Sequence, residues 1–196
     1  MPHVVILAGP SGSGKSHLAE RLGWTVLRLD DFYHDHDHPG LPLSTLGIVD
    51  WDDVRSWNLE AAMTAIEELC RDGRTQVPVY DISVSQAVGT HEVVLNGDRF
   101  IAEGLFATDM VAPCREAGVL DAAICLTRPR PVVFWLRLVR DLRESRKPPM
   151  TLVRRGWRLM RDQPRVIAEA VAAGCVTMHP RRAYRFLTSG GPTRLL

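Results

Sequence analysis

The segment Gly9–Ser16 constrains the fold of this chain more than any other stretch. It consists of Gly-Pro-Ser-Gly-Ser-Gly-Lys-Ser and lies between the apolar run His3–Ala8 and the periodic segment Leu18–Leu22. This order predicts a strand, a glycine-rich turn and a helix, which is the context in which a G-x-x-x-x-G-K-S pattern forms a phosphate-binding loop. Glycines let the backbone turn tightly and point successive N–H groups at an anion, and the helix adds its positive N-terminal end.

The loop predicts a nucleotide site. We expect Lys15 to reach the outer phosphates of ATP and Ser16 to offer its hydroxyl to Mg²⁺. Of the 24 lysines and arginines only Lys15 and Lys147 are lysine, and this bias indicates that a compact ammonium is needed at these positions. The residues expected to bind the nucleotide are Gly9, Ser11, Gly12, Ser13, Gly14, Lys15, Ser16 and His17. The alternative is a glycine-rich turn without a ligand.

Length and composition predict one globular domain over residues 1–196. The chain is 45% hydrophobic and 24% charged, and its net charge of +1 gives no global field that would favour nucleic acid or an anionic membrane. The four cysteines are scattered without a C-x-x-C pair, so we expect buried free thiols in a reducing compartment. No apolar run is long enough to span a membrane, and no signal-peptide pattern opens the chain, so a cytoplasmic location is expected.

Two acidic residues follow predicted buried strands. The run Thr25–Leu29 ends at Asp30, where an open α/β sheet places its ligands, and we expect Asp30 to accept a proton from a substrate hydroxyl. Phe100–Ala102 ends at Glu103, which is placed to bind Mg²⁺ directly or through water. The alternatives are that Asp30 caps a helix or faces solvent, and that Glu103 faces solvent.

Further elements follow from local signals. Asn58 and Gly73 predict the start and stop of a helix from Leu59 to Arg71. Val77–Asp81 predicts an extended piece, and the strand His91–Leu95 followed by Asn96-Gly97 predicts a hairpin turn into the next strand. Asp121–Leu126 and Cys175–Met178 predict two more strands, and the residues from Arg181 onward give little signal.

The segment His34–His38 alternates His and Asp, a pattern that suggests a metal cluster. The prolines and glycine that follow it give no rigid scaffold, so we expect a mobile polar loop rather than a zinc site.

Residues 128–165 are strongly basic, with twelve arginines and lysines against three acidic residues. They predict two basic helices, about residues 131–145 and 152–161, joined by a Pro-Pro hinge, which suit a lid over residues 143–160 that closes on phosphates. A solvated basic face is the plain alternative. Nucleic-acid binding is a third, although the segment has few aromatic side chains for stacking.

Taken in order, the motifs GPSGSGKS, LDDFY, DWD, VPVYD, AEG and RLVRD resemble the uridine kinase branch of the P-loop kinases, over residues 4–147. That branch is related to the phosphoribulokinase and nicotinamide riboside kinase groups. The resemblance implies a three-layer α/β/α fold with a mostly parallel five-stranded sheet, a small β-hairpin insertion and a basic helical lid. It also implies an enzyme that uses ATP and Mg²⁺.

The resemblance implies specific roles for the matched positions. Asp30 would be the general base on the sugar 5′-hydroxyl, and Ser16 and Glu103 would hold Mg²⁺. Contacts with substrate or phosphate would come from Asp52 at the ribose hydroxyls, Tyr80 beside the nucleoside, and Tyr33, Arg137, Arg140 and Lys147.

Two departures from the family pattern leave the acceptor open. Uridine kinases usually carry an aromatic residue and then a His after P-V-Y-D, where this chain has Ile82–Ser85, and H-P-x-x-F-D after DWD, where it has Asp53–Asn58. A site that cannot hydrogen-bond a base edge discriminates poorly on it.

The first expectation is therefore an ATP-dependent kinase of a nucleoside hydroxyl, and a kinase of pantothenate, another riboside or a sugar phosphate is the second. A regulatory or nucleic-acid-associated ATP-binding protein is the third. We expect a small-molecule substrate without a nucleic-acid or membrane partner, and a homo-oligomer is left open.

Overall fold

The computed structural model describes residues 1–129, 131–133 and 163–189. Five parallel strands form one sheet in the order β2-β5-β1-β6-β7. The sheet confirms the predicted fold class, and its central strands are long apolar runs with almost fully buried side chains. Its strands are β1 (His3–Ala8), β2 (Val26–Arg28), β5 (Arg99–Glu103), β6 (Leu120–Leu126) and β7 (Val176–Met178).

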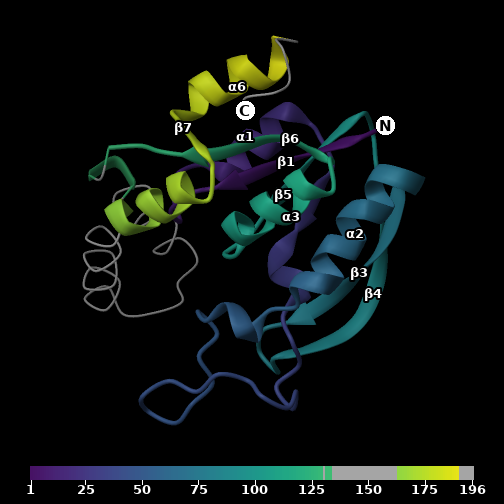
Figure 1. The fold of residues 1–196 in the computed structure, drawn as a ribbon, viewed down its shortest axis with the longest axis vertical. Helices are drawn as coiled ribbons and strands as arrows, with labels where there is room; N and C mark the ends of the chain where they lie inside the picture. The colour runs from purple at the N-terminus through teal and green to yellow at the C-terminus, as the bar shows by residue number, and fades with distance from the viewer. Residues whose placement is uncertain (130, 134–162, 190–196) are drawn as a thin grey trace.

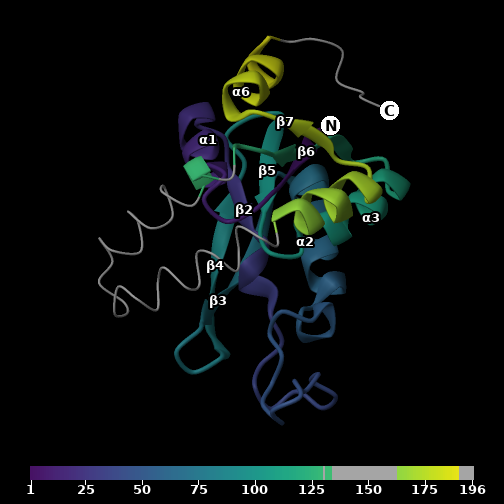
Figure 2. The same cartoon turned by 90° about the vertical axis from the view of Figure 1, so that its left-hand side faces the viewer.

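Helices cover both faces of this sheet, so the molecule has three layers (Figures 1 and 2). Strand β1 divides its side chains by alternation, with Val4 and Ile6 in one core and Val5 and Leu7 in the other. The first core is covered by α2 (Leu59–Asp72) and α3 (Val111–Glu116). The second is covered by α1 (Lys15–Leu22) and α6 (Pro180–Thr188).

The ends of α2 follow the prediction within one residue. The Asn58 side chain accepts a hydrogen bond from the Ala61 N–H at 3.0 Å, and Gly73 adopts the left-handed conformation at φ 72°. The part of the chain that the structure describes also contains three short 3₁₀ helices: η1 (Leu29–Phe32), η2 (Val54–Ser56) and η3 (Ala107–Met110).

The hairpin is present, but its predicted turn was wrong. Strands β3 (Arg74–Asp81) and β4 (Gln86–Val94) pair antiparallel as a separate two-stranded sheet, and the turn consists of residues 82–85 rather than Asn96-Gly97. The Asp81 carboxylate accepts hydrogen bonds from both the N–H and the hydroxyl of Ser83, at 2.8 and 2.6 Å, and this local pairing makes the turn. The Asn96 side chain accepts instead from the Thr25 N–H at 3.1 Å, so Asn96-Gly97 connects the hairpin to the main sheet.

The C-terminal part of the described chain contains a helix over residues 163–172, then β7 and α6. The sequence did not predict α6, which begins at Pro180 after the His179 cap and buries Ala183 and Leu187. The predicted lid and the two basic helices lie outside the described residues, apart from 131–133. All four cysteines are free and buried. Among the described residues, no helix combines the length and the apolar character needed to cross a membrane.

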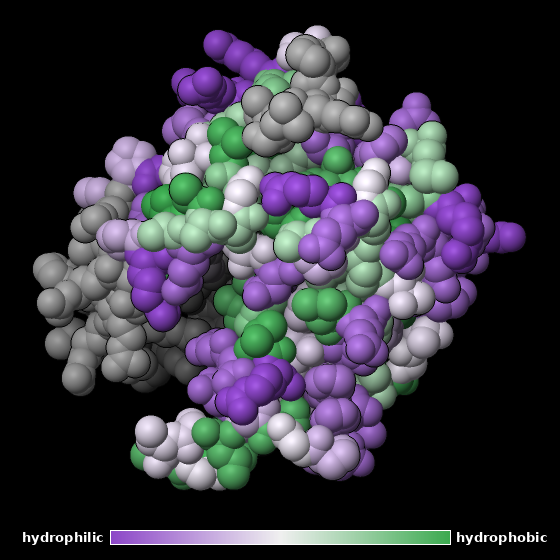
Figure 3. All heavy atoms as spheres, in the orientation of Figure 1, coloured by the Kyte–Doolittle hydropathy of each residue, from purple (hydrophilic) through white to green (hydrophobic). Residues whose placement is uncertain are grey.

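The long connection between η1 and α2 projects away from the three layers at the lower end of Figure 1. Its outer part exposes Leu43, Leu46 and Ile48, and the lobe at the lower left of Figure 3 accordingly shows hydrophobic surface. This connection leads directly into residues 50–53, which form one side of the candidate site.

Candidate active site

The phosphate loop connects β1 to α1, as its sequence predicts. Gly9 has φ +129°, and a Cβ atom there would lie 2.6 Å from the Leu126 carbonyl oxygen, so only glycine fits. Gly14 caps α1 at φ +100°. The Lys15 ammonium donates a hydrogen bond to the Gly9 carbonyl at 2.8 Å. The Lys15 side chain therefore lies across the loop in which it is predicted to contact the phosphates.

Ser13 differs from its neighbours in the loop. Its side chain is fully buried, and its N–H donates to the Pro10 carbonyl at 3.0 Å. Its hydroxyl has no hydrogen-bond partner among the described residues. Ser13 therefore supports the shape of the loop in this structure, whereas Ser11, Ser16 and His17 are exposed.

The structure brings the two predicted magnesium ligands together. The Ser16 hydroxyl lies 3.4 Å from a Glu103 carboxylate oxygen, because β5 pairs with β1 in the register that sets Leu7 beside Glu103. Burial raises the pKa of Glu103, the Lys15 charge opposes this shift, and the Asp30 charge adds to it. Lys15, Asp30 and Glu103 are thus close enough for their charges to interact.

This pair suits Mg²⁺ better than a metal held by the protein alone. No group of three or more His, Cys, Asp or Glu side chains that could hold a metal occurs among the described residues. Mg²⁺ usually takes one or two protein oxygens and completes its shell with waters and substrate phosphates. One hydroxyl and one carboxylate beside a phosphate loop fit this requirement.

Asp30 lies in η1, immediately after β2, and its carboxylate has a fixed orientation. It accepts a hydrogen bond from the Leu105 N–H at 2.7 Å. A Cβ atom on Gly104 would lie 2.7 Å from the same carboxylate, so the glycine that follows Glu103 makes room for Asp30. The buried Trp57 indole fixes η1 from the other side, donating to the Leu29 carbonyl at 2.7 Å.

An aromatic cluster lies beside Asp30. The ring of Tyr33 contacts those of Trp51, Tyr80 and Phe106, with centroid distances of 5.8, 5.7 and 5.9 Å. The Tyr33 hydroxyl donates to the Trp51 carbonyl at 3.2 Å. Burial raises the pKa of Tyr33, and the negative charges of Asp30 and Asp52 raise it further, so the phenol remains a hydrogen-bond donor.

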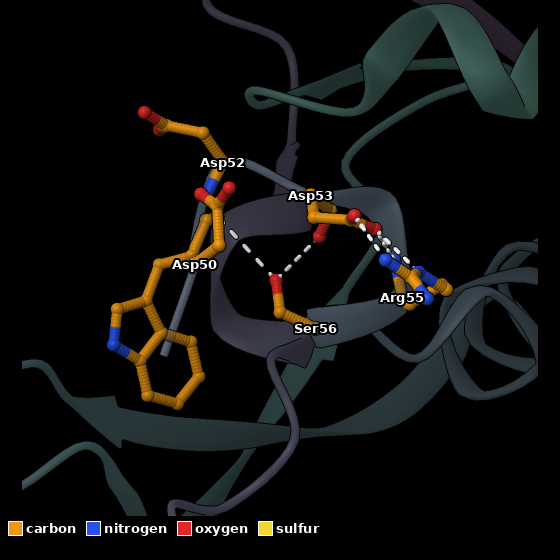
Figure 4. Close-up of polar contacts among 6 residues, drawn as sticks. Asp50, Asp52, Asp53, Arg55 and Ser56 are labelled. Atoms are coloured by element: carbon orange, nitrogen blue, oxygen red, sulfur yellow. Dashed lines mark hydrogen bonds and ion pairs between the residues drawn. The ribbon is translucent and has the colours of Figure 1, made fainter. Parts of the chain in front are cut away.

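Asp52 occupies the turn that follows Trp51. Figure 4 shows its carboxylate turned away from the ion pair of Asp53 and Arg55, whose atoms approach to 2.7 Å. The Asp50 carboxylate accepts from the Asp52 N–H at 3.2 Å, and the Ser56 hydroxyl donates to the Asp53 carbonyl at 2.7 Å. These bonds shape the turn and leave the Asp52 side chain exposed.

The segment His34–His38 is hydrogen-bonded to the hairpin. The Tyr80 hydroxyl donates to the His34 carbonyl at 3.1 Å, and the His36 N–H donates to the Ser85 carbonyl at 2.9 Å. The rings of His34 and His38 stack at 3.9 Å. Burial and the neighbouring His38 lower the pKa of His34, which disfavours a charged stack.

Three predicted substrate contacts, Arg137, Arg140 and Lys147, lie outside the described residues. Sequence reasoning missed the individual role of Arg128, which it counted only within the basic stretch. Its Nε donates to the Ser13 carbonyl at 2.9 Å. The position of Arg128 two residues after a predicted buried strand was the available signal, since strand ends converge on the ligand edge.

Comparisons with known proteins find relatives at low sequence identity. No family model matches the chain. It is 28% identical to the uridine kinase of Saccharomyces cerevisiae over 149 residues, which cover 72% of this chain and 29% of the yeast protein. It is 23% identical to the uridine kinase of Clostridium tetani over 150 residues, which cover 73% of this chain and 69% of the clostridial protein.

A third relative carries a different name. The inorganic pyrophosphatase TTM2 of Arabidopsis thaliana is 26% identical over 159 residues, which cover 76% of this chain but 21% of the plant protein. The chain therefore spans less than a third of the yeast and plant relatives.

A solved structure supports the fold. A candidate fructose transport system kinase from Silicibacter sp. TM1040 superimposes with a TM-score of 0.55 and 21% identity, over 88% of this chain and 84% of that chain. The chain thus has the P-loop kinase fold and is a distant relative of uridine kinases.

Proposed function

We propose that this chain is a small-molecule kinase that transfers the γ-phosphoryl group of ATP, with Mg²⁺, to a hydroxyl group, and that the 5′-hydroxyl of a nucleoside is its acceptor. The observation that carries this proposal is the convergence of Lys15, Ser16, Glu103 and Asp30 at the carboxyl edge of three neighbouring strands, β1, β5 and β2. A phosphate loop alone predicts only nucleotide binding. A fixed carboxylate beside it adds a base for an acceptor hydroxyl.

The donor half of the proposed site consists of the loop amides, Lys15, Ser16 and Glu103. Lys15 would exchange its bond with the Gly9 carbonyl for the outer phosphates. Ser16 and Glu103 would hold Mg²⁺, which supplies positive charge against the charge that spreads over the transferred group. Arg137 and Arg140, outside the described residues, are proposed to stabilise the same charge.

The acceptor half consists of Asp30, Tyr33, Asp52 and Tyr80. Asp30 would accept the hydroxyl proton while the acceptor oxygen bonds to the γ-phosphorus and the bond from that phosphorus to the ADP oxygen breaks. The Leu105 N–H and Gly104 keep the carboxylate in one orientation for this step. The exposed Asp52 would bind ribose hydroxyls, and the rings of Tyr33 and Tyr80 would flank the nucleoside.

Recognition of a particular base has weaker support. Ile82, Ser83 and Val84 are exposed at the hairpin turn, where uridine kinases usually carry an aromatic residue and a His. The proposal is therefore a kinase with relaxed selectivity for the base. A kinase of another riboside, of pantothenate or of a sugar phosphate is the second candidate, which this departure favours.

A screen of acceptors tests the proposal. Purified protein with ATP and Mg²⁺ is incubated with uridine, cytidine, adenosine, other ribosides, pantothenate and sugar phosphates, and ADP release and the phosphorylated product are both measured. We expect nucleosides to be phosphorylated, with less than about a tenfold spread in kcat/KM among bases, because an unread base edge contributes little discrimination. Strict preference for uridine and cytidine would contradict the relaxed selectivity for the base. Failure to phosphorylate any of the hydroxyl acceptors would contradict the proposed kinase activity.

A further inference from the structure

The segment that follows β6 contacts the phosphate loop through the side chain of Arg128. Strand β6 is the neighbour of β1 on the side opposite β5 and β2, so it supplies none of the residues placed in the proposed site. Arg128 follows the end of β6 by two residues, and its side chain reaches the loop.

Arg128 contacts the loop at the peptide that starts α1. Its Nε donates to the Ser13 carbonyl at 2.9 Å, and its guanidinium lies against Gly14, where a Cβ atom would be 3.2 Å from one terminal nitrogen. A side chain at Gly14 would therefore press on the guanidinium. This glycine is explained by its φ of +100° and by the arginine packed over it.

The bond to Ser13 orients a neighbouring donor. The chain contains no cis peptide bond among its described residues, and in a trans peptide the carbonyl and the following N–H point in opposite directions. A Ser13 carbonyl held toward Arg128 therefore points the Gly14 N–H to the other side of the loop. The N–H groups at the start of α1 are the donors that a phosphate requires.

Arg128 is itself held in place. The buried Gln163 side chain donates to the Arg128 carbonyl at 3.0 Å, and the Thr127 N–H donates to the Met178 carbonyl at 2.9 Å. The Gln163 side-chain oxygen is buried and has no hydrogen-bond partner among the described residues. Among the described residues, the hydrogen bond that Gln163 makes is thus the one to the Arg128 carbonyl, and it ties the backbone of Arg128 to the helix over residues 163–172.

We infer that Arg128 is a positioning residue of the phosphate loop, which holds the Ser13–Gly14 peptide in its anion-binding orientation and is anchored by Gln163. Its permanent positive charge lies beside the loop and favours phosphate further. This inference rests on the part of the proposed function that concerns ATP binding, and it does not depend on the identity of the acceptor. It predicts a loss of affinity for phosphate-bearing ligands, with adenosine bound equally by the wild type and the variant.

The test measures dissociation constants for ATP, ADP and adenosine by calorimetry in the wild type and in Arg128→Ala, Arg128→Lys and Gln163→Leu. Loss of one hydrogen bond from a charged group predicts about a ten- to hundredfold weaker affinity for ATP and ADP in Arg128→Ala. Arg128→Lys should be intermediate and Gln163→Leu smaller in the same direction. Arg165→Ala is the matched control, since Arg165 is an exposed arginine on the helix over residues 163–172 that contains Gln163, and it lies 3.6 Å from Glu169.

Two further readouts separate positioning from folding. Added methylguanidinium should restore part of the ATP affinity of Arg128→Ala, and the melting temperature of Arg128→Lys should stay near that of the wild type. ATP affinity within twofold of the wild type in Arg128→Ala would overturn the inference, as would an equal loss for adenosine. If ATP binds but no acceptor is phosphorylated, the proposed function fails and the affinity of Arg128→Ala still decides the inference.

Discussion

At the scale of single residues, the two carboxylates of the candidate site lie in different environments. Asp30 accepts a backbone N–H and lies against a glycine, whereas Glu103 faces a hydroxyl and is partly buried beside Lys15. Burial is the largest influence on Glu103 and raises its pKa. The hydrogen-bonded Asp30 is suited to proton transfer. The partly buried Glu103 is suited to binding a cation, because a bound cation favours its ionised form.

The raised pKa of Glu103 predicts a pH dependence of Mg²⁺ binding. As pH falls toward that pKa, Glu103 takes up a proton earlier than an ordinary glutamate, and the affinity for Mg²⁺ in the presence of ATP should fall with it. Glu103→Gln should bind Mg²⁺ about 10- to 100-fold more weakly, as losses of metal-site partners commonly do, and should lose the part of the pH dependence that Glu103 adds to that of the ATP phosphates. Titrations of Mg²⁺ at several pH values measure both.

The same shift has a consequence for stability. A carboxyl whose folded pKa is raised contributes stability below its unfolded pKa and loses that contribution as pH rises through its folded pKa. Without Mg²⁺, Glu103→Gln should therefore melt at or above the wild-type temperature at neutral pH. A clearly lower melting temperature for Glu103→Gln would contradict this account of its environment.

At the scale of elements, capping and turn residues in the sequence predicted those helix ends that hydrogen bonds between near neighbours in the chain determine. Asn58 and Gly73 bound α2 because a side-chain oxygen and a left-handed residue end a helix wherever they occur. The hairpin turn was misplaced because Asn96-Gly97 suits a turn as well as Asp81–Ser83 does. Long-range interactions decide between them, namely the pairing of β3 with β4 and the bonds of Asn96 to Gly23 and Thr25.

The α2 cap gives a prediction for this scale. Asn58→Ala removes the bond to the Ala61 N–H and should lower the free energy of unfolding by about 1 kcal/mol. Asn58→Asp keeps an acceptor at the same place and serves as the control. Denaturant unfolding checks both variants, and equal stability of the Ala variant and the wild type would show that the cap contributes nothing.

At the scale of the whole molecule, the order of the sheet divides the loop's neighbours into two sets. Strands β2 and β5 bring Asp30 and Glu103 to one side of β1, and β6 brings Arg128 to the other. The carboxyl edge as a ligand site could be predicted from the sequence, because strand ends converge there. The sequence also places Arg128 near that edge, two residues after a predicted strand, but its contact with Ser13 depends on the pairing of β6 with β1, which no local signal gives.

An ion pair lies at the amino ends of the strands, opposite the candidate site. Arg99 at the start of β5 lies 3.2 Å from the nearly buried Asp121 of β6. Burial raises the pKa of Asp121 and the Arg99 charge lowers it. At the amino ends of the strands this ion pair links β5 to β6, whereas Asp30 and Glu103 lie at the carboxyl ends.

Asp30 is proposed to accept the proton of the acceptor hydroxyl. Single-turnover and steady-state kinetics of Asp30→Asn, with the best acceptor of the screen, test it most directly. The amide keeps a hydrogen-bond acceptor for the Leu105 N–H but cannot take up a proton, so kcat should fall about 10²- to 10⁴-fold, with the dissociation constant for ATP unchanged. Turnover of Asp30→Asn near that of the wild type at saturating acceptor would contradict the account.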